Sequence, residues 1–361
     1  MRLIKKIISA AIAAITVMSI VNTGTLISFA DTSFDYGDFR FTRTSATTVM
    51  VSKYYGDSTN VTLPESVDGT TVTGVYQSCF ENTDVVSVTI PHAYKVIGAF
   101  AFNGCTQLRT VRLPSSLTSI GIMAFGGCSL LQSIDLTYTN NLSSIAFAAF
   151  SGCTSLENLC LPNSITTLGD NVFSGCSSLG EVKLPSGLKV IPEYAFSGCA
   201  IESIELPENL TTISEGAFSD NTALNEIDLP YSVTTLGARC FENDTNLSEI
   251  FLPEAISSIG DGFLDPMSEG SIDVICYNNT YSYAYCEAYG IHNLTGTEKL
   301  IGDANLDGVV NINDVTEIQK YIAHIDVVKT YRAKNLADVI PDGKIMITDV
   351  TTLQRKLAGM I

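Results

Sequence analysis

Apolar residues recur along most of the chain at an interval of 22 or 23 residues. A Leu-Pro or Ile-Pro pair begins at seven positions in this register, and the spacing rises to 25 residues only between Leu136, where threonine replaces the proline, and Leu161. A phenylalanine keeps the same interval at Phe80, Phe102, Phe125, Phe150, Phe173, Phe196, Phe218, Phe241 and Phe263. Because one unit of this size cannot bury its own apolar side, the pattern predicts stacked units that share one core.

Each unit predicts two short strands and a buried turn. The clearest copy spans residues 179–199, L-G-E-V-K-L-P-S-G-L-K-V-I-P-E-Y-A-F-S-G-C, and alternates apolar with polar residues near its start. Proline then ends the first strand because it has no N–H to donate. The side chains expected to point inward are Leu179, Val182, Leu184, Leu188, Ile191 and Phe196.

The positions that alternate with these inward residues are expected on one exposed sheet face. Its candidate ligand-binding residues are Glu181, Lys183, Glu205, Glu226, Asp228 and Glu249, with Ser203 and Phe251 at equivalent positions. Such a face could bind a ligand, since solenoids use extended surfaces for recognition, or could only keep the sheet solvated. Because a regular sheet has no pocket that would desolvate a carboxylate, catalysis is not expected here.

The repeat array, residues 79–271, is flanked by segments with other patterns. Residues 31–78 alternate apolar and polar residues around two turns and predict a β-rich N-terminal cap. Residues 272–292 predict a closing strand and a short helix, whose tyrosines either cover the last unit or form a binding patch. Solenoid ends need such covers. Residues 293–300 are polar and predict a short, moderately flexible linker.

The C-terminal part, residues 301–361, carries a calcium-loop pattern twice. The first copy, D-A-N-L-D-G-V-V-N-I-N-D, places oxygen donors at the loop positions that Ca²⁺ uses, with Gly308 at the sharp turn. The expected ligands are Asp303, Asn305, Asp307, the Val309 carbonyl, Asn311 through water, and Asp314. Asp314 closes the loop where most such loops have glutamate.

The second copy lies 35 residues further along and is less complete. Its remaining donors are Asp338, Asp342, the Lys344 carbonyl and Asp349. Ile340 and Met346 occupy two positions that need a side-chain oxygen. We therefore expect one strong Ca²⁺ site and one weak or unoccupied site.

One amphipathic helix is predicted after each loop, the first over residues 313–323. The inward residues are expected to be Val315, Ile318 and Ile322 in one helix and Val350, Leu353 and Leu357 in the other. Val310 and Ile345 should pair in a small strand-like contact between the loops. Two helices this short bury little apolar surface, so calcium should carry much of the folding free energy.

A duplicated calcium loop with one helix after each copy resembles the type I dockerin of cellulosomal proteins, over Ile301 to Ile361. The resemblance implies docking on a cohesin domain of a scaffoldin. Positions that commonly face the cohesin in that family correspond to Ile312, Asn313, Gln319, Lys320, Ile347, Thr348, Gln354 and Arg355. The two isoleucines could instead flank the core. Because the two copies present similar surfaces, the module could dock in two orientations. The symmetry is broken where Asn313 of one copy corresponds to Thr348 of the other.

The repeats resemble the bacterial leucine-rich repeats of the BspA-like surface-antigen group. The iterated elements L-x-x-[IV]-x-L-P and A-F-x-x-C carry this resemblance from about Val61 to Leu264. It implies a leucine-rich-repeat solenoid. The expected fold class is therefore α+β: a solenoid with a β-rich N-terminal cap, followed by a small α-helical, calcium-binding dockerin.

The ten cysteines are placed in an unusual way for a disulfide framework. Five occupy one repeat position, three residues after a phenylalanine: Cys105, Cys128, Cys153, Cys176 and Cys199. This spacing predicts a column of buried free thiols. Cys276 and Cys286 lie beyond the repeats and are the first pair to test for a bridge.

Residues 1–30 combine a basic start, an apolar stretch and small residues before Asp31, which is typical of a secretory signal peptide. Its removal takes away Arg2, Lys5 and Lys6 and changes the formal net charge from −18 to −21. This acidity argues against nucleic acid as a partner. No later stretch is long and apolar enough for a membrane span.

No recognisable catalytic motif is present. His92, His292 and His324 are far apart, and the nucleophile elbow, phosphate-binding loop and dinucleotide fingerprint are missing. The sequence therefore predicts a secreted, non-catalytic cellulosome component that displays its repeats for protein or surface binding. The alternatives are an enzyme or accessory subunit in plant polysaccharide breakdown and a structural spacer.

Overall fold

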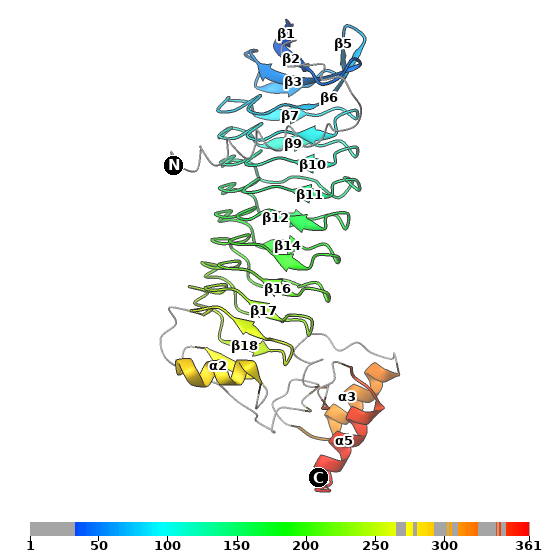
Figure 1. Cartoon of the computed structure of the whole chain (residues 1–361), viewed down its shortest axis with the longest axis vertical. Helices are drawn as coiled ribbons and strands as arrows, with labels where there is room; N and C mark the ends of the chain where they lie inside the picture. Colours follow the sequence, from blue (N-terminus) through cyan, green and yellow to red (C-terminus); the bar gives the residue numbers. More distant parts are fainter. Residues whose placement is uncertain are drawn as a thin grey trace, which may run out of the picture.

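The computed structural model describes residues 33–264, 272–276, 280–291, 302, 304, 310–323, 337, 339–340 and 344–360. The predicted signal peptide and the predicted linker, residues 293–300, lie outside these ranges. The described repeat residues form a solenoid of stacked coils between the N-terminal strands and helix α2 (Figure 1). None of the described helices is long and apolar enough to cross a membrane.

The N-terminal cap is a small sheet that merges into the solenoid. Strands β1 (Ser33–Tyr36), β2 (Phe39–Arg43) and β3 (Thr48–Tyr54) pair antiparallel. Strand β3 then pairs parallel with β6 (Thr70–Val75), which also pairs antiparallel with β5 (Ser66–Val67). The change from antiparallel to parallel pairing at β3 therefore joins the cap to the first coil.

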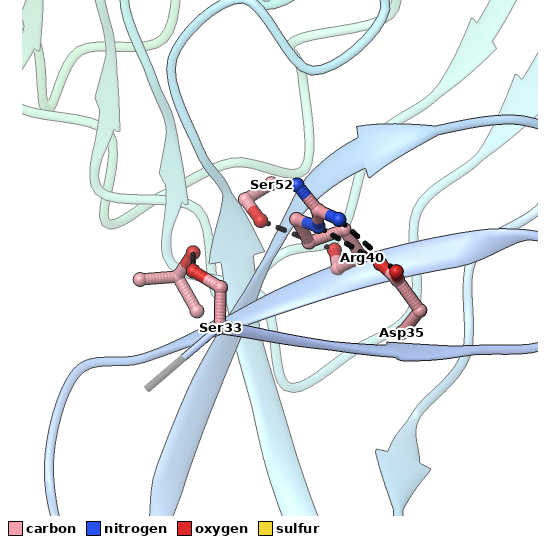
Figure 2. Close-up of polar contacts among 5 residues, drawn as sticks. Ser33, Asp35, Arg40 and Ser52 are labelled. Atoms are coloured by element: carbon pink, nitrogen blue, oxygen red, sulfur yellow. Dashed lines mark hydrogen bonds and ion pairs between the residues drawn. The ribbon is translucent and has the colours of Figure 1, made fainter. Parts of the chain in front are cut away.

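An exposed polar cluster crosses the outer strands of this cap. The Arg40 guanidinium donates two hydrogen bonds to the Asp35 carboxylate, at 2.8 and 3.0 Å, and the Ser52 hydroxyl donates to the Arg40 carbonyl at 3.3 Å (Figure 2). The hydrogen bond from Arg40 lowers the pKa of Asp35. Solvent screens exposed pairs of this kind, so the cap depends mainly on buried residues such as Phe41.

The repeat units contribute two sets of parallel strands. The first set contains β4 (Asn60–Thr62), β7 (Ser87–Thr89), β9 (Thr110–Arg112), β12 (Asn158–Cys160), β14 (Glu181–Lys183), β18 (Glu249–Leu252) and β20 (Asp273–Cys276). The second contains β8 (Val96–Ile97), β10 (Ser119–Ile120), β11 (Ser144–Ile145), β13 (Thr167–Leu168), β15 (Val190–Ile191), β16 (Thr212–Ile213), β17 (Thr235–Leu236) and β19 (Ser258–Ile259). Paired residues are one unit apart, as Leu159 and Val182 are. The predicted stacking of short strands is confirmed.

A column of phenylalanines fills the core beneath the turns. The rings from Phe80 to Phe241, one per unit, stack with centroids 5.0–5.8 Å apart and planes inclined by 5–18°. Tyr54 continues the column at the N-terminal end, 5.1 Å from Phe80, and Tyr285 meets Phe263 edge to face at 5.8 Å. Both caps therefore cover the column with a tyrosine.

The five cysteines of the repeat position form a second column. Each thiol donates a hydrogen bond to a phenylalanine carbonyl of the preceding unit, at 2.9–3.4 Å. All five are buried and free, as predicted. Burial raises the pKa of Cys105 to about 11 and that of Cys176 to about 12, which keeps these thiols protonated and unreactive.

Two polar residues replace cysteine at the C-terminal end of this column. The Asn221 amide side chain donates to the Phe196 carbonyl at 2.8 Å, and the Asn221 backbone N–H donates to the Asp244 carboxylate at 2.8 Å. Asp244 is fully buried, and desolvation raises its pKa to about 8. The last units thus contain a buried carboxyl group at the position where the earlier units have a thiol.

Helix α2 (Tyr281–Tyr289) covers the last coil. The Thr280 side chain caps its first turn, and Gly290, at a φ of 64°, ends it in the left-handed conformation. Tyr285 is buried and donates to the Gly260 carbonyl at 3.0 Å, whereas Tyr281 and Tyr289 are exposed. The predicted closing strand and helix are present, and the covering role applies to Tyr285.

The C-terminal module contains two described helices, α3 (Ile312–Ile322) and α5 (Ile347–Leu357), which pack together. Their buried residues include Val315, Ile318, Val350 and Leu353, as predicted. The prediction that Leu357 points inward is wrong, because this residue lies at the end of α5 and is 43% exposed.

The predicted contact between the two loops is only partly present. Val310 and Ile345 both pack against the core of the module. Among the described residues, however, no β-bridge joins them. Their side chains contribute to the core without extending the backbone hydrogen bonding.

Candidate binding sites

The six predicted ligand-face residues lie on the first set of strands or in line with it. Glu181, Lys183, Glu205 and Glu226 are exposed, while Asp228 and Glu249 are half-buried. A parallel bridge between Ser203 and Glu226 continues the line beyond β14. The structure therefore places these residues on successive coils, as the alternation predicts.

Three of these residues line a hollow at the C-terminal end of the face. It has a volume of about 270 Å³ and is lined by Asn225, Glu226, Ile227, Asp228, Ser248, Glu249, Phe251 and Ile275. Carboxylates and amide or hydroxyl groups lie beside the three apolar residues Ile227, Phe251 and Ile275. This chemistry suits a ligand that combines cationic or hydroxyl groups with an apolar surface.

The regular sheet face that the alternation predicts is hollowed at its last units. The hollow lies where the first set of strands is interrupted. Among the described residues, a parallel bridge between Ser203 and Glu226 joins this part of the face to the preceding unit, and β18 pairs with β20 over four residues.

The expected exposure of Phe251 is also wrong. This side chain is 6% exposed, and its partner in the parallel register is Ile275, which is 5% exposed. Two bulky apolar residues side by side on neighbouring strands shield one another. Sequence reasoning missed Ile275 as a lining residue. The signal was available, because Ile275 is two residues after Asp273 and the period-two alternation of the earlier strands places both on the outward face.

No group of three or more His, Cys, Asp or Glu side chains within the described ranges is arranged to hold a metal ion. His92 is described, whereas His292 and His324 lie outside those ranges. The described part of the solenoid therefore has an exposed polar face and a hollow, and no assembled metal centre.

The C-terminal module holds the closing carboxylate of each calcium loop in a buried position. Asp314 and Asp349 are 0% and 1% exposed, each in the first turn of its helix. Asp314 accepts a hydrogen bond from the Asn311 backbone N–H at 2.8 Å. A buried carboxylate needs such donors or a cation, so this arrangement fits a calcium ligand.

The second loop is held by its closing carboxylate in a specific way. One Asp349 oxygen accepts from the Met346 backbone N–H and the other from the Ile340 backbone N–H, both at 2.8 Å. Loop positions three and nine are thus tied to position twelve through the backbone, although their side chains carry no oxygen. Ile340 and Met346 are 41% and 46% exposed.

The other predicted ligands divide into two groups. Asn311 and Lys344 are described, and the Asn311 side chain caps α3 by accepting from the Asn313 N–H at 2.8 Å. The rest lie outside the described residues: Asp303, Asn305, Asp307, Val309, Asp338 and Asp342. The unequal strength of the two sites stays a prediction.

The predicted cohesin-facing residues lie at the surface. Ile312 and Ile347 are 63% and 60% exposed. The other exposed members are Asn313, Gln319, Thr348, Gln354 and Arg355. Lys320 is half-buried and pairs with Glu317 at 2.7 Å. The alternative that the two isoleucines flank the core is wrong.

Both parts of the chain match known protein families. The BspA type leucine rich repeat region matches residues 73–195 and 143–268, which together span more than half of the 361 residues. The chain belongs to the BspA-type leucine-rich-repeat family. In this leucine-rich-repeat protein, residues 301–358 also match the dockerin type I domain.

Solved structures support the solenoid fold. A leucine-rich repeat protein from Bacteroides ovatus is similar with a TM-score of 0.62 and 26% identity, over 73% of this chain and 67% of that one. A leucine rich cell surface protein from Faecalibacterium prausnitzii has a TM-score of 0.53 and 21% identity, over 73% and 94% of the two chains. No curated protein matches the chain.

The two matched domains imply a coarse function. A type I dockerin implies calcium binding and docking on a cohesin in a cellulosome-type assembly, and leucine-rich repeats imply a binding module. Both kinds of domain are non-catalytic, and the comparisons reveal no catalytic domain.

Proposed function

We propose that this leucine-rich-repeat protein is exported, docks through its dockerin on the cohesin of a scaffoldin, and displays its solenoid for binding to a protein or a cell surface. The main observation behind this proposal is the dockerin match at residues 301–358, in which seven of the eight positions predicted to face a cohesin are exposed. The predicted signal peptide supports export, and the face with its hollow supports display of a binding module.

A pull-down from culture fluid tests this function. The whole mature chain and a chain ending at residue 296 serve as baits, each with and without a calcium chelator. We expect the whole chain alone to capture scaffoldin, and only without chelator, because the dockerin needs calcium to fold. Capture of scaffoldin by the truncated chain would contradict the role of the dockerin.

A matched pair of variants tests the docking residues. Ile312→Asp and Ile347→Asp place a charge at equivalent, exposed positions of the two halves. If the dockerin binds in two orientations, each single variant should retain binding to an immobilised type I cohesin and the double variant should lose it. If one half dominates, one single variant should weaken binding by about tenfold or more. Unchanged binding by the double variant would contradict these positions.

The second candidate function is hydrolysis of a plant polysaccharide. The hollow brings together Glu226, Asp228 and Glu249, and glycosidases use two carboxylates across a site. An assay of the purified protein on plant polysaccharides separates the two functions. Hydrolysis that disappears in the Glu226→Gln/Asp228→Asn variant would overturn the non-catalytic proposal.

A further inference from the structure

Two cysteines lie outside the thiol column, at the C-terminal end of the solenoid. Cys276 ends strand β20 and Cys286 lies in helix α2. Their side chains are 3% and 0% exposed and belong to the same buried core. The two thiols lie close enough together to interact with each other, and both are free. A strand and a helix thus bring two thiols together.

The surroundings of this pair differ from those of the column. In the column, a thiol such as Cys153 donates to a backbone carbonyl, Phe125 O, at 3.2 Å. At the cap, the two thiol side chains interact with each other instead, and this interaction lowers the pKa of Cys276 and raises that of Cys286. A thiol with a lowered pKa is the better nucleophile near neutral pH.

Helix α2 is held to the last coil by contacts next to the cysteine pair. Tyr285, next to Cys286, donates to the Gly260 carbonyl at 3.0 Å and packs on Phe263. On the strand, Cys276 lies opposite Leu252 and follows Ile275, which lines the hollow. A covalent link between the two cysteines would therefore join the cap helix to a strand of the binding hollow.

We propose that Cys276 and Cys286 form a redox-active pair that closes to an intramolecular disulfide on reaction with a low-molecular-weight disulfide oxidant. The Cys276 thiolate attacks one oxidant sulfur, forms a mixed disulfide and expels one thiolate. The Cys286 thiolate then attacks the Cys276 sulfur and expels the second thiolate. Two S–H bonds and the oxidant S–S bond break, one protein S–S bond forms, and the two protons end on the two released thiols, which hold the two electrons.

The consequence is a cap whose stiffness depends on the redox environment. In the reduced state, α2 is held by packing and hydrogen bonds and can open locally. In the oxidised state, the bridge limits that opening, because it removes conformations from the unfolded ensemble of the cap. Since Ile275 precedes one of the bridged residues, the same bridge restrains one wall of the hollow.

The test is a thiol count on the full mature chain in the Cys160→Ser background. Cys160 is the cysteine of the repeats that is only half-buried, and it would otherwise form a mixed disulfide with the oxidant. The protein is incubated with oxidised glutathione, denatured, alkylated and weighed as an intact chain. From nine alkylated thiols before oxidation, ten in the sequence minus Cys160, we expect seven afterwards.

Chymotrypsin then locates the bridge, because it cleaves after the tyrosines between the two cysteines, such as Tyr281. We expect the two resulting peptides to stay joined until reduction. Cys276→Ser and Cys286→Ser should each abolish the loss of two thiols, whereas Cys128→Ser, in the column, should preserve it. Oxidation should also raise the apparent melting temperature by a few degrees in the parent protein and in neither cap variant.

Three results would overturn the proposal. The first is a count of nine thiols after oxidation under conditions that open α2, such as low denaturant. The second is a bridge that maps to the column. The third is continued loss of two thiols in Cys286→Ser. The thiol count does not depend on cohesin binding, so it succeeds or fails independently of the proposed function.

Discussion

The solenoid and the dockerin bury apolar side chains on very different scales. The solenoid has one continuous core from Phe41 to Cys286, whereas the dockerin core, among the described residues, contains seven buried side chains. In the solenoid every unit also shields its neighbours, so stability is the sum of many similar contacts. The small dockerin core cannot provide this, so we expect calcium to be the main support of its loops.

The two parts also treat buried polar groups differently. The column thiols and Asn221 donate to backbone carbonyls of the preceding unit, so their hydrogen bonds reinforce the stacking. In the dockerin, the buried Asp314 and Asp349 accept from backbone N–H groups at the start of a helix. With the exception of Asp244, the solenoid column thus contains neutral donors, whereas the dockerin buries carboxylates where a cation is expected.

Calcium removal is the strongest test of this comparison. With a chelator, we expect the dockerin helices to lose their circular dichroism signal while the solenoid melts at an unchanged temperature, because only the dockerin folding depends on the ion. Unfolding of the solenoid together with the dockerin on addition of the chelator would contradict the independent stability of the solenoid.

The two calcium loops can be compared directly by calorimetric titration. Asp314→Asn should weaken the strong site by about tenfold or more, since affinity follows the number of charged ligands, and Asp349→Asn should leave that site nearly unchanged. Two equally tight sites in the parent protein would contradict the predicted inequality.

Truncation of one ring in the phenylalanine column should have the next largest effect. Phe150→Ala is expected to lower the free energy of unfolding by about 3–5 kcal/mol, because it leaves a cavity between two stacked neighbours. Phe147→Ala is the matched control, since Phe147 is 39% exposed and its loss should cost about 0.5 kcal/mol or less. Urea denaturation of both variants gives the comparison, and equal effects would contradict the column as the main support.

The pH dependence of the solenoid should depend on Asp244. Its pKa is about 8 in the folded state and near the ordinary value of 3.8 in the unfolded state. Between these two pH values, the carboxyl group is protonated in the folded state only. Its contribution to stability is complete below about pH 4 and falls as the pH rises towards 8, by a few kcal/mol at most. We expect Asp244→Asn to flatten this slope in urea midpoints measured at pH 5 and 8. Parallel slopes in variant and parent would contradict this assignment.

Removal of one thiol from the column should have the smallest measurable effect. Cys153→Ala deletes a buried sulfur and its hydrogen bond to Phe125 O, which should cost about 1–2 kcal/mol. Cys160→Ala, on the half-buried outer side of β12, should cost about 0.5 kcal/mol or less. Equal effects in urea denaturation would show that the column adds nothing specific.

Much of the architecture was predictable because it repeats. The period of Phe80, Phe102 and the later rings indicates stacking, and period-two alternation indicates which strand residues face outward. The helices of the dockerin follow from the same kind of argument, and α3 begins one residue before the predicted start. The failures lie near the ends of regular segments: Phe251, in the last units of the solenoid, is buried, and Leu357, at the end of α5, is exposed.

The sequence by itself determined the periodic core, the free thiol column and the two calcium loops, because each depends on residue type at a fixed spacing. Only the tertiary structure decided that the outer face is hollowed near Glu226, that Asp244 is buried, and that Phe251 is covered. These outcomes depend on how neighbouring coils and the cap helix pack laterally. Spacing along one chain specifies which way a side chain points, but it does not specify how far the next strand lies from it.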